Sequence, residues 1–258
     1  MKLTVLVENI TKKDNISAEH GLSLYIETGS HKILFDMGQT DMFAKNAKEL
    51  GISIEDVDIA IISHGHYDHG GGLKTFLELN KKAPVYINQN AFLPYYNNAQ
   101  KYIGLDTSLK NDPRLIYTKD FWRISDGLCL YSHNEKKPNN SFGNFGLTKK
   151  IEDRFVPDDF KHEQYLLIEE NGKRILLSGC SHKSIIDIVD WTLPDVLVGG
   201  FHFSKMPLDD ELKKAAIKIG SYKTSYYTCH CTGIEQFEFM KKYIKDLYYI
   251  SSGNEYLI

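Results

Sequence analysis

The sequence lacks long apolar runs, a strong excess of charge of one sign, and an abundance of cysteine. No stretch approaches the roughly 18 apolar residues that a membrane-spanning helix needs. The formal net charge is only −3 over 258 residues, so there is no electrostatic reason to expect nucleic acid or an anionic membrane as a partner. Three of the four cysteines lie in short motifs with histidine, which fits thiols in a reducing compartment better than a disulfide framework. The N-terminal residues 2–8 alternate like a strand rather than a secretion signal, and we expect a cytoplasmic protein.

Apolar residues make up 42% of the chain, which is enough for a sizeable core. Segments rich in Val, Ile, Leu and Tyr alternate with segments of helical periodicity. The expected strands are residues 2–8, 22–28, 32–35, 59–63, 85–88, 127–131, 165–169, 174–178, 196–199, 226–228 and 248–251. The expected helices are residues 40–50, 71–80, 184–191, 209–219 and 234–245. Two groups of strands interspersed with helices predict a sandwich of two sheets covered by helices.

The most informative segment follows the hydrophobic run of residues 57–62 and places three histidines and one aspartate within six residues. Imidazole nitrogen and carboxylate oxygen are ligands of Zn²⁺, Fe²⁺ and Mn²⁺. His64 and His66 lie two residues apart and can face one metal ion from an extended turn. Asp68 and His69 come after a further bend and can face a second ion, at the separation of about 3.5–4 Å that is usual in two-metal sites. The alternative is a polar loop that is merely rich in histidine.

This hexapeptide, HGHYDH, resembles the HxHxDH motif of the metallo-β-lactamase superfamily. Further resemblances lie in residues 33–38 (ILFDMG), 176–182 (LLSGCSH), 199–202 (GGFH) and 229–233 (CHCTG). The combination of the last three is similar to the branch of dihydropterin–ribofuranosylaminobenzene 5′-phosphate synthase-like proteins. The resemblance runs from about residue 3 to the C-terminus. It implies a single domain over residues 1–258 of the α/β class (α+β type), a four-layer αββα sandwich of two mixed β-sheets flanked by helices.

The resemblance also implies a set of metal ligands for two divalent ions, with zinc expected and iron or manganese as alternatives. The implied ligands are His64, His66, Asp68, His69, Cys180, His182 and His230. Cys180 stands where the superfamily usually has a bridging aspartate, and a thiolate can serve there; a small buried cysteine is the alternative. For His230, a structural histidine is the alternative. Asp36 is expected to accept a hydrogen bond from a ligand histidine and so fix its tautomer.

One departure from the superfamily pattern concerns the third ligand of the first metal. That histidine usually lies some two dozen residues before the bridging position, and the only candidate here is His162, whose neighbours do not resemble the usual motif. We therefore expect His182 to complete the set with His64 and His66. His202 follows a hydrophobic strand and is interpreted as a substrate-facing or ligand-orienting group rather than as a metal ligand. No role is assigned to His20, His31, His133 or His162.

Residues 90–160 are rich in turn-forming residues with aromatics interleaved, and long loops in compact domains are usually functional or disordered. We interpret this region as an insertion that caps the metal site, with a homodimer contact as a further use and a mobile surface loop as the alternative. Its aromatic side chains suit a planar or partly apolar small molecule. The expected substrate-binding residues are Tyr95, Tyr96, Phe142 and Phe145.

Three functions are compatible with this sequence. The first is a metal-dependent hydrolase that acts on a small molecule through metal-bound hydroxide, with Asp68 orienting the hydroxide and His202 donating a proton to the leaving group. The second, implied by the narrower resemblance, is a transferase that joins a dihydropterin methyl diphosphate to a ribofuranosylaminobenzene phosphate. The third is a non-enzymatic, metal-dependent sensor, because fold does not fix function.

Overall fold

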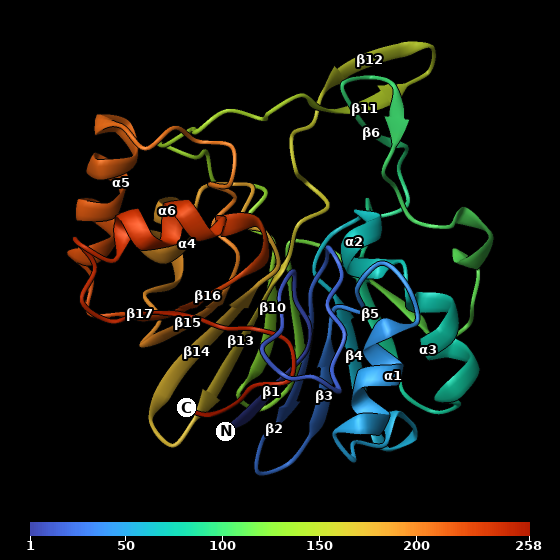
Figure 1. Ribbon diagram of the computed structural model, residues 1–258. Helices are drawn as coiled ribbons and strands as arrows, with labels where there is room; N and C mark the ends of the chain where they lie inside the picture. Colours follow the sequence, from blue (N-terminus) through green and yellow to red (C-terminus); the bar gives the residue numbers. More distant parts are fainter.

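The computed structural model describes residues 1–258 and shows two stacked β-sheets with helices on both outer faces (Figure 1). This arrangement confirms the four-layer αββα sandwich. The helices are α1 (Met42–Glu49), α2 (Tyr67–Gly70), α3 (Leu73–Leu79), α4 (Ile185–Thr192), α5 (Asp210–Gly220) and α6 (Ile234–Met240), with three short 3₁₀ turns at Ile54–Asp56, Thr107–Leu109 and His230–Thr232. None of these helices is long and apolar enough to cross a bilayer. A cytoplasmic location stays a prediction.

The first sheet contains seven strands and covers most of the N-terminal half of the chain. Its order is β18 (Glu255–Leu257), β1 (Lys2–Val7), β2 (Ser23–Glu27), β3 (Lys32–Phe35), β4 (Ile59–Ile62), β5 (Val85–Asn88) and β8 (Leu115–Thr118). The strands from β18 to β3 pair antiparallel, whereas β3, β4, β5 and β8 run parallel. Parallel strands need crossover connections, which helices α1 and α3 supply here.

The second sheet also contains seven strands and repeats this combination of antiparallel and parallel pairing. Its order is β17 (Leu247–Tyr249), β16 (Ser225–Thr228), β15 (Val196–Gly199), β14 (Lys173–Ser178), β13 (Tyr165–Glu170), β10 (Leu128–Tyr131) and β9 (Phe121–Ser125). Strands β14 to β17 run parallel, and the remaining pairs are antiparallel. Helices α4, α5 and α6 lie on its outer face (Figure 1).

Three large apolar clusters hold the four layers together. One lies between the sheets and includes Leu24, Phe35 and Leu177; a second joins the first sheet to α1 and α3; a third joins the second sheet to α4, α5 and α6. Parallel strands with both faces covered read as continuous apolar runs. The segments IAII of β4 and VLVG of β15 are buried at every position.

The region 90–160 divides into two parts. Strands β8, β9 and β10 extend the two main sheets, whereas β6 (Tyr95–Asn97), β7 (Lys101–Tyr102), β11 (Leu147–Ile151) and β12 (Arg154–Pro157) form a separate four-stranded sheet. This small sheet stands apart from the sandwich, beyond α2 (Figure 1). The sequence did not predict these four strands, because they are short and largely half-exposed.

Candidate metal centre

The histidine motifs meet because they follow the carboxyl ends of strands in both sheets. His64 follows β4, Cys180 and His182 follow β14, His202 follows β15, and His230 follows β16. In open α/β sheets, ligands bind outside the carboxyl ends of the strands. Here two sheets bring these ends to one edge of the sandwich, so residues more than 160 positions apart, such as His69 and His230, become neighbours.

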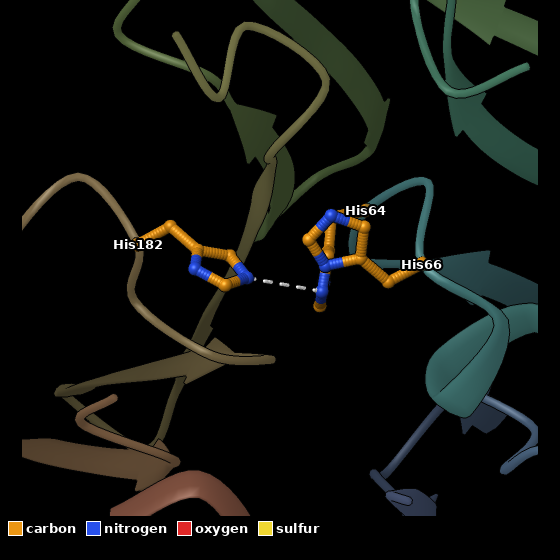
Figure 2. A group of neighbouring side chains, drawn as sticks. All are labelled: His64, His66 and His182. Atoms are coloured by element: carbon orange, nitrogen blue, oxygen red, sulfur yellow. Dashed lines mark hydrogen bonds between the residues drawn. The ribbon is translucent and has the colours of Figure 1, made fainter. Parts of the chain in front are cut away.

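A first cluster consists of His64 and His66 from the loop after β4, with His182 facing them from the loop after β14 (Figure 2). The Nε2 atoms of His64 and His182 lie 3.3 Å apart. The backbone N–H of His182 donates to Glu163 Oε1 over 2.8 Å, and the His182 ring stacks on Phe160 at 4.5 Å. Two nitrogens bound to one tetrahedral zinc at 2.0–2.1 Å would lie about 3.3 Å apart, so this spacing fits a shared cation.

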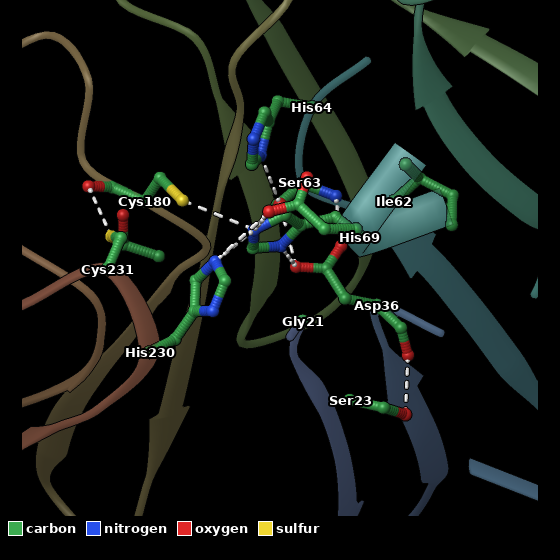
Figure 3. Close-up of polar contacts among 12 residues, drawn as sticks. Gly21, Ser23, Asp36, Ile62, Ser63, His64, His69, Cys180, His230 and Cys231 are labelled. Atoms are coloured by element: carbon green, nitrogen blue, oxygen red, sulfur yellow. Dashed lines mark hydrogen bonds and ion pairs between the residues drawn. The ribbon is translucent and has the colours of Figure 1, made fainter. Parts of the chain in front are cut away.

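A second cluster consists of Asp68, His69 and His230. The Nε2 atoms of His69 and His230 lie 3.2 Å apart, and Asp68 Oδ2 lies 3.3 Å from His230 Nε2. Cys180 Sγ lies 3.2 Å from His69 Nε2 (Figure 3) and also groups with His64. Cys180 therefore lies between the two clusters, where a ligand shared by two ions belongs.

The donor atoms present fit divalent cations. Pairs of imidazole nitrogens face each other at 3.2–3.3 Å, and the buried His66 Nε2 and His182 Nδ1 have no hydrogen-bond partner. Buried polar atoms are rarely left unpartnered in proteins. Burial, reinforced by neighbouring imidazoles, holds the pKa of His64 and His182 well below the usual value. Their lone pairs are thus free for a metal.

The charges of the second cluster also favour a cation. Burial opposes ionisation of Asp68, but His69 and hydrogen bonds from His20 and His230 hold its pKa well below the usual value. Burial likewise opposes protonation of His69, but the carboxylates of Asp36 and Asp68 outweigh it and raise its pKa to about 9. A negative field that favours a proton on His69 also favours a divalent ion at the same place.

Asp36 lies behind the loop and orients two of the histidines. Its backbone has a φ of +61° directly after β3, a conformation that costs energy and often marks functional sites. Its carboxylate accepts hydrogen bonds from Ser63 N (2.7 Å), Ser63 Oγ (2.7 Å) and His69 Nδ1 (2.6 Å). His64 Nδ1 lies 2.8 Å from Ser63 Oγ. Both histidines therefore present Nε2 to the site, through a serine that the sequence did not single out.

Two further orienting residues, Glu8 and Asn9, also escaped the sequence analysis. Asn9 Oδ1 lies 2.8 Å from His230 Nδ1, and the fully buried Glu8 accepts the His230 backbone N–H at 2.7 Å. Ligand histidines usually donate their second nitrogen to such a group. The available signal was polar residues directly after an apolar strand, which is the pattern that singled out Asp36.

His162 and Asp158 support the metal-binding loop of residues 64–69 through hydrogen bonds. His162 Nδ1 accepts the Gly65 N–H at 2.8 Å, and its Nε2 lies 3.0 Å from Asp158 Oδ2. Burial lowers the pKa of His162 to about 4, against the opposing effect of Asp158. Asp158 Oδ2 also lies 3.7 Å from His66 Nε2. Both nitrogens of His162 are thus engaged, whereas His182 reaches the first cluster.

His202 and His20 lie at the edge of the clusters. His202 has a φ of +58°, and both of its ring nitrogens are buried without a partner. Its ring centroid is 4.2 Å from that of His182. The exposed His20 places Nε2 3.3 Å from Asp68 Oδ2, and this hydrogen bond raises its pKa. Nothing in the surrounding sequence had distinguished His20.

Two cavities meet at His182 and His202. The first, of about 320 Å³, is lined by both histidines and by Asn9, His20, His66, Tyr67, Asp68, Asn97, Lys101, Ile103, Leu147, Cys180, Ser204, Lys205, His230, Cys231, Gly233, Ile234 and Tyr249. The second, of about 370 Å³, lies against the loop of residues 138–145 and the residues that precede α4. The site is therefore accessible from two sides.

The four aromatic residues expected to bind substrate occupy different places. Phe142 and Phe145 line the second cavity, and the Phe145 ring lies 5.4 Å from that of His202. Tyr95 is only 1% exposed and packs on His162 at 4.0 Å, so it supports the metal loop. Tyr96 packs against Tyr102 and Phe155 in the small sheet. Neither tyrosine lines either of these two cavities, because Tyr95 packs against the metal loop and Tyr96 packs within the small sheet.

With this fold and donor set, the chain belongs to the metallo-β-lactamase superfamily, whose family model matches residues 17–218. Members of this superfamily are usually metal-dependent enzymes, and the histidine, aspartate and cysteine clusters agree with divalent-metal binding.

Individual relatives narrow the comparison. The chain is 29% identical to the 7,8-dihydropterin-6-methyl-4-(β-D-ribofuranosyl)-aminobenzene-5′-phosphate synthase of Methanocaldococcus jannaschii, over 96% of this chain and 98% of that one. It is 27% identical to the exodeoxyribonuclease WalJ of Streptococcus pneumoniae, over 63% of each chain. The crystal structure of a metal-dependent hydrolase of the β-lactamase superfamily superposes with a TM-score of 0.83 and 26% identity, covering 100% of this chain and 99% of that one.

Proposed function

We propose that this protein is a hydrolase that uses two divalent metal ions to cleave a small molecule. Zinc is the expected metal. The observation that carries the proposal is the pair of donor clusters on either side of Cys180, open to a cavity of about 320 Å³. Catalytic metal sites keep a coordination position open for water or substrate. A purely structural site would be closed by protein ligands.

The residues of the site would have two roles, binding the ions and orienting the ligands. His64, His66 and His182 would hold one ion, and Asp68, His69 and His230 the other, with Cys180 between them. Such ions, when bound, lower the pKa of water and polarise a carbonyl or phosphoryl oxygen. The chain itself fixes the imidazoles through Asp36, Ser63 and Asn9, so that little reorganisation is needed during the reaction.

His202 is the residue placed to handle a proton. Its imidazole nitrogens have no partner within the protein, and the side chain lies on the wall common to both cavities. A proton held at one of these nitrogens can pass to a leaving group in either cavity. The aromatic side chains Phe142 and Phe145 would hold the planar or apolar part of the substrate.

A second candidate is a transferase that joins two small molecules. Two cavities meet at His182 and His202, as a reaction between two bound substrates requires. The relative that is named a synthase matches almost the whole chain. On this alternative, a dihydropterin methyl diphosphate would occupy one cavity and a ribofuranosylaminobenzene phosphate the other, with the metals holding the diphosphate leaving group.

The test is a comparison of wild type with His66→Ala, using His31→Ala as the matched control outside the site. We expect wild type to bind two divalent ions by elemental analysis and to cleave at least one substrate in a panel of phosphoesters, thioesters, lactones and amides. His66→Ala should lose metal and turnover, and His31→Ala should keep both. Full metal and turnover in His66→Ala would show that the site is misassigned.

Adding a pterin diphosphate with an arylamine riboside, and long DNA, to this panel separates the alternatives. Diphosphate release that needs both a pterin diphosphate and an arylamine riboside would favour the transferase. Metal binding without any turnover would favour a sensor. Preferred cleavage of long DNA, which the similarity to WalJ makes worth including, would contradict a small-molecule substrate.

A further inference from the structure

A second group of potential ligands adjoins the two clusters and is rich in sulfur. The ligand atoms of Cys180, His202 and Cys231 all lie within 4.8 Å of one another. Two sulfurs on one tetrahedral zinc at about 2.3 Å would lie about 3.8 Å apart, so small side-chain rotations would let these atoms share an ion. Only Cys180 of this group also belongs to the histidine clusters.

We propose that Cys180, His202 and Cys231 form a third cation site, which takes a thiophilic ion such as Zn²⁺ or Cu⁺. Thiolate ligands select such ions over the harder cations that carboxylates accept. The proposal does not rest on the proposed function: with the third ion bound, one nitrogen of His202 would hold the ion and the other would still carry a proton. It depends on the three side chains and on the space that the backbone leaves for them.

The His202 side chain has no hydrogen-bond partner within the protein. Both of its ring nitrogens are buried and neither has a hydrogen-bond partner, which is unusual for a buried imidazole. The residue has a left-handed backbone, with φ at +58°, three residues after the end of β15. A bound cation would satisfy one nitrogen and would account for a backbone conformation that otherwise costs energy.

The surroundings of the Cys231 sulfur leave room for an ion and favour a charged sulfur. Its sulfur accepts the backbone N–H of His202 at 3.2 Å, a bond that stabilises a charged sulfur. A Cβ on Gly200 would lie 2.4 Å from this sulfur, so only glycine leaves room for it. Cys229, two residues earlier, belongs instead to the apolar core between the sheets. The chain thus directs one cysteine of this motif into the core and the other towards the site.

A cation can reach all three side chains from solvent. Cys180, His202 and Cys231 all line the first cavity, and Figure 3 shows Cys180 and Cys231 on the side of the site that faces away from Asp36. An ion can therefore reach these three side chains from the same cavity that opens onto the histidine clusters. The fourth position of a tetrahedral ion would stay open to the cavity.

The experiment is a cadmium titration of metal-free, reduced protein, followed by thiolate-to-cadmium absorbance and by elemental analysis of bound cadmium. We expect wild type to bind three cadmium ions, with absorbance from two thiolates. Cys231→Ser should bind one ion fewer and lose about half of the absorbance. Cys229→Ser is the matched control, a buried cysteine of the same motif, and should behave like wild type.

His202→Asn provides the second variant, which keeps a polar side chain and tests the site without touching sulfur. It should weaken binding of the third ion at least tenfold while circular dichroism stays unchanged. The proposal is overturned if wild type binds no more than two ions, or if Cys231→Ser and His202→Asn both bind three as tightly as wild type. Failure of the proposed hydrolase would instead appear as absent turnover with the cadmium stoichiometry unaffected.

Discussion

At the scale of single residues, hydrogen bonds decide which nitrogen of His64, His69 and His230 faces the site. Ser63 contacts Nδ1 of His64, Asp36 contacts Nδ1 of His69, and Asn9 contacts Nδ1 of His230. Nε2 of each ring is left to face the site. Neutral imidazole has one donor and one acceptor nitrogen, so a partner at Nδ1 makes Nε2 the acceptor. The orienting residues therefore matter almost as much as the ligands themselves.

Replacement of Asp36 tests this arrangement. In Asp36→Asn, the amide nitrogen cannot accept the hydrogen bonds that Oδ2 now receives from Ser63 and His69. We expect metal affinity to fall by about 10- to 100-fold, measured by competition with a chromophoric chelator. Asp153→Asn, at a fully exposed turn, is the control. An unchanged affinity in Asp36→Asn would contradict an orienting role.

At the scale of elements, the metal loop is held by close packing rather than by its own turn. Gly65 lies against the segment before β6, and a Cβ at this position would lie 2.2 Å from Ala91 O and 2.9 Å from Tyr95 Cε2. Backbone atoms cannot move aside as a flexible side chain can. The small sheet therefore acts on the site through this contact.

We expect Gly65→Ala to displace the loop and to lower both metal affinity and stability. Overpacking of this kind costs about 1–3 kcal/mol, which thermal unfolding of the metal-free protein can measure. Gly29→Ala is the control, because its Cβ would meet only the end of the Glu170 side chain at 3.4 Å. Wild-type metal binding by Gly65→Ala would show that the loop does not depend on this packing.

The loop of residues 139–146 is attached to α4 by one carboxylate. The buried Asp187 accepts hydrogen bonds from Asn139 N (2.8 Å), Asn140 N (3.0 Å) and Asn140 Nδ2 (3.1 Å). The loop carries Phe142 and Phe145 to the second cavity. The order of this cavity wall therefore depends on a residue outside the cavity.

Asp187→Ala should loosen the wall and raise KM by about three- to tenfold, since each hydrogen bond contributes about 1 kcal/mol. Bound metal should stay unchanged in elemental analysis. Asp190→Ala, on the same helix but paired with Tyr222 and Lys218, should leave KM as it is. Equal KM values for all three proteins would remove the loop from the substrate site.

At the scale of the whole molecule, a buried histidine outside the site couples folding to pH. His133 packs among Tyr131, Tyr165 and Trp191. Burial first, and then Lys136, lower its pKa from 6.5 to about 4. Above pH 6.5, neither the folded nor the unfolded chain is protonated here. Between pH 6.5 and 4 the unfolded chain binds the proton first, so the free energy of unfolding falls as pH falls.

His133→Gln should remove this part of the pH dependence. We expect the loss of stability between pH 6.5 and 4 to be smaller than in wild type by about 2 kcal/mol, after allowance for partial access to solvent. Urea unfolding of the chelated proteins at several pH values measures the difference, with His31→Gln as the control. Parallel curves for wild type and His133→Gln would show that His133 does not carry the effect.

Much of the fold and part of the site could be read from the sequence alone. The five expected helices and eleven expected strands lie within a few residues of observed elements, because apolar periodicity is a local property. The spacing from His64 to His69 is also local. It predicted that His64 and His66 would face one ion, and Asp68 and His69 another, from a single loop. The sequence analysis missed the small sheet, the edge strands β8, β9 and β18, and the single-turn helix α2, because each is short.

Tertiary structure alone decided which residues orient and support the ligands. Asn9 meets His230 across 221 positions, and Gly65 meets His162 across 97. No local pattern shows which distant residue such a group will meet, since that depends on how the two sheets bring separate segments to the common edge. Spacing along the chain determined which ligands lie together on one loop. The stacking of the two sheets determined which loops face each other, because the stacking depends on how the apolar faces of the sheets pack.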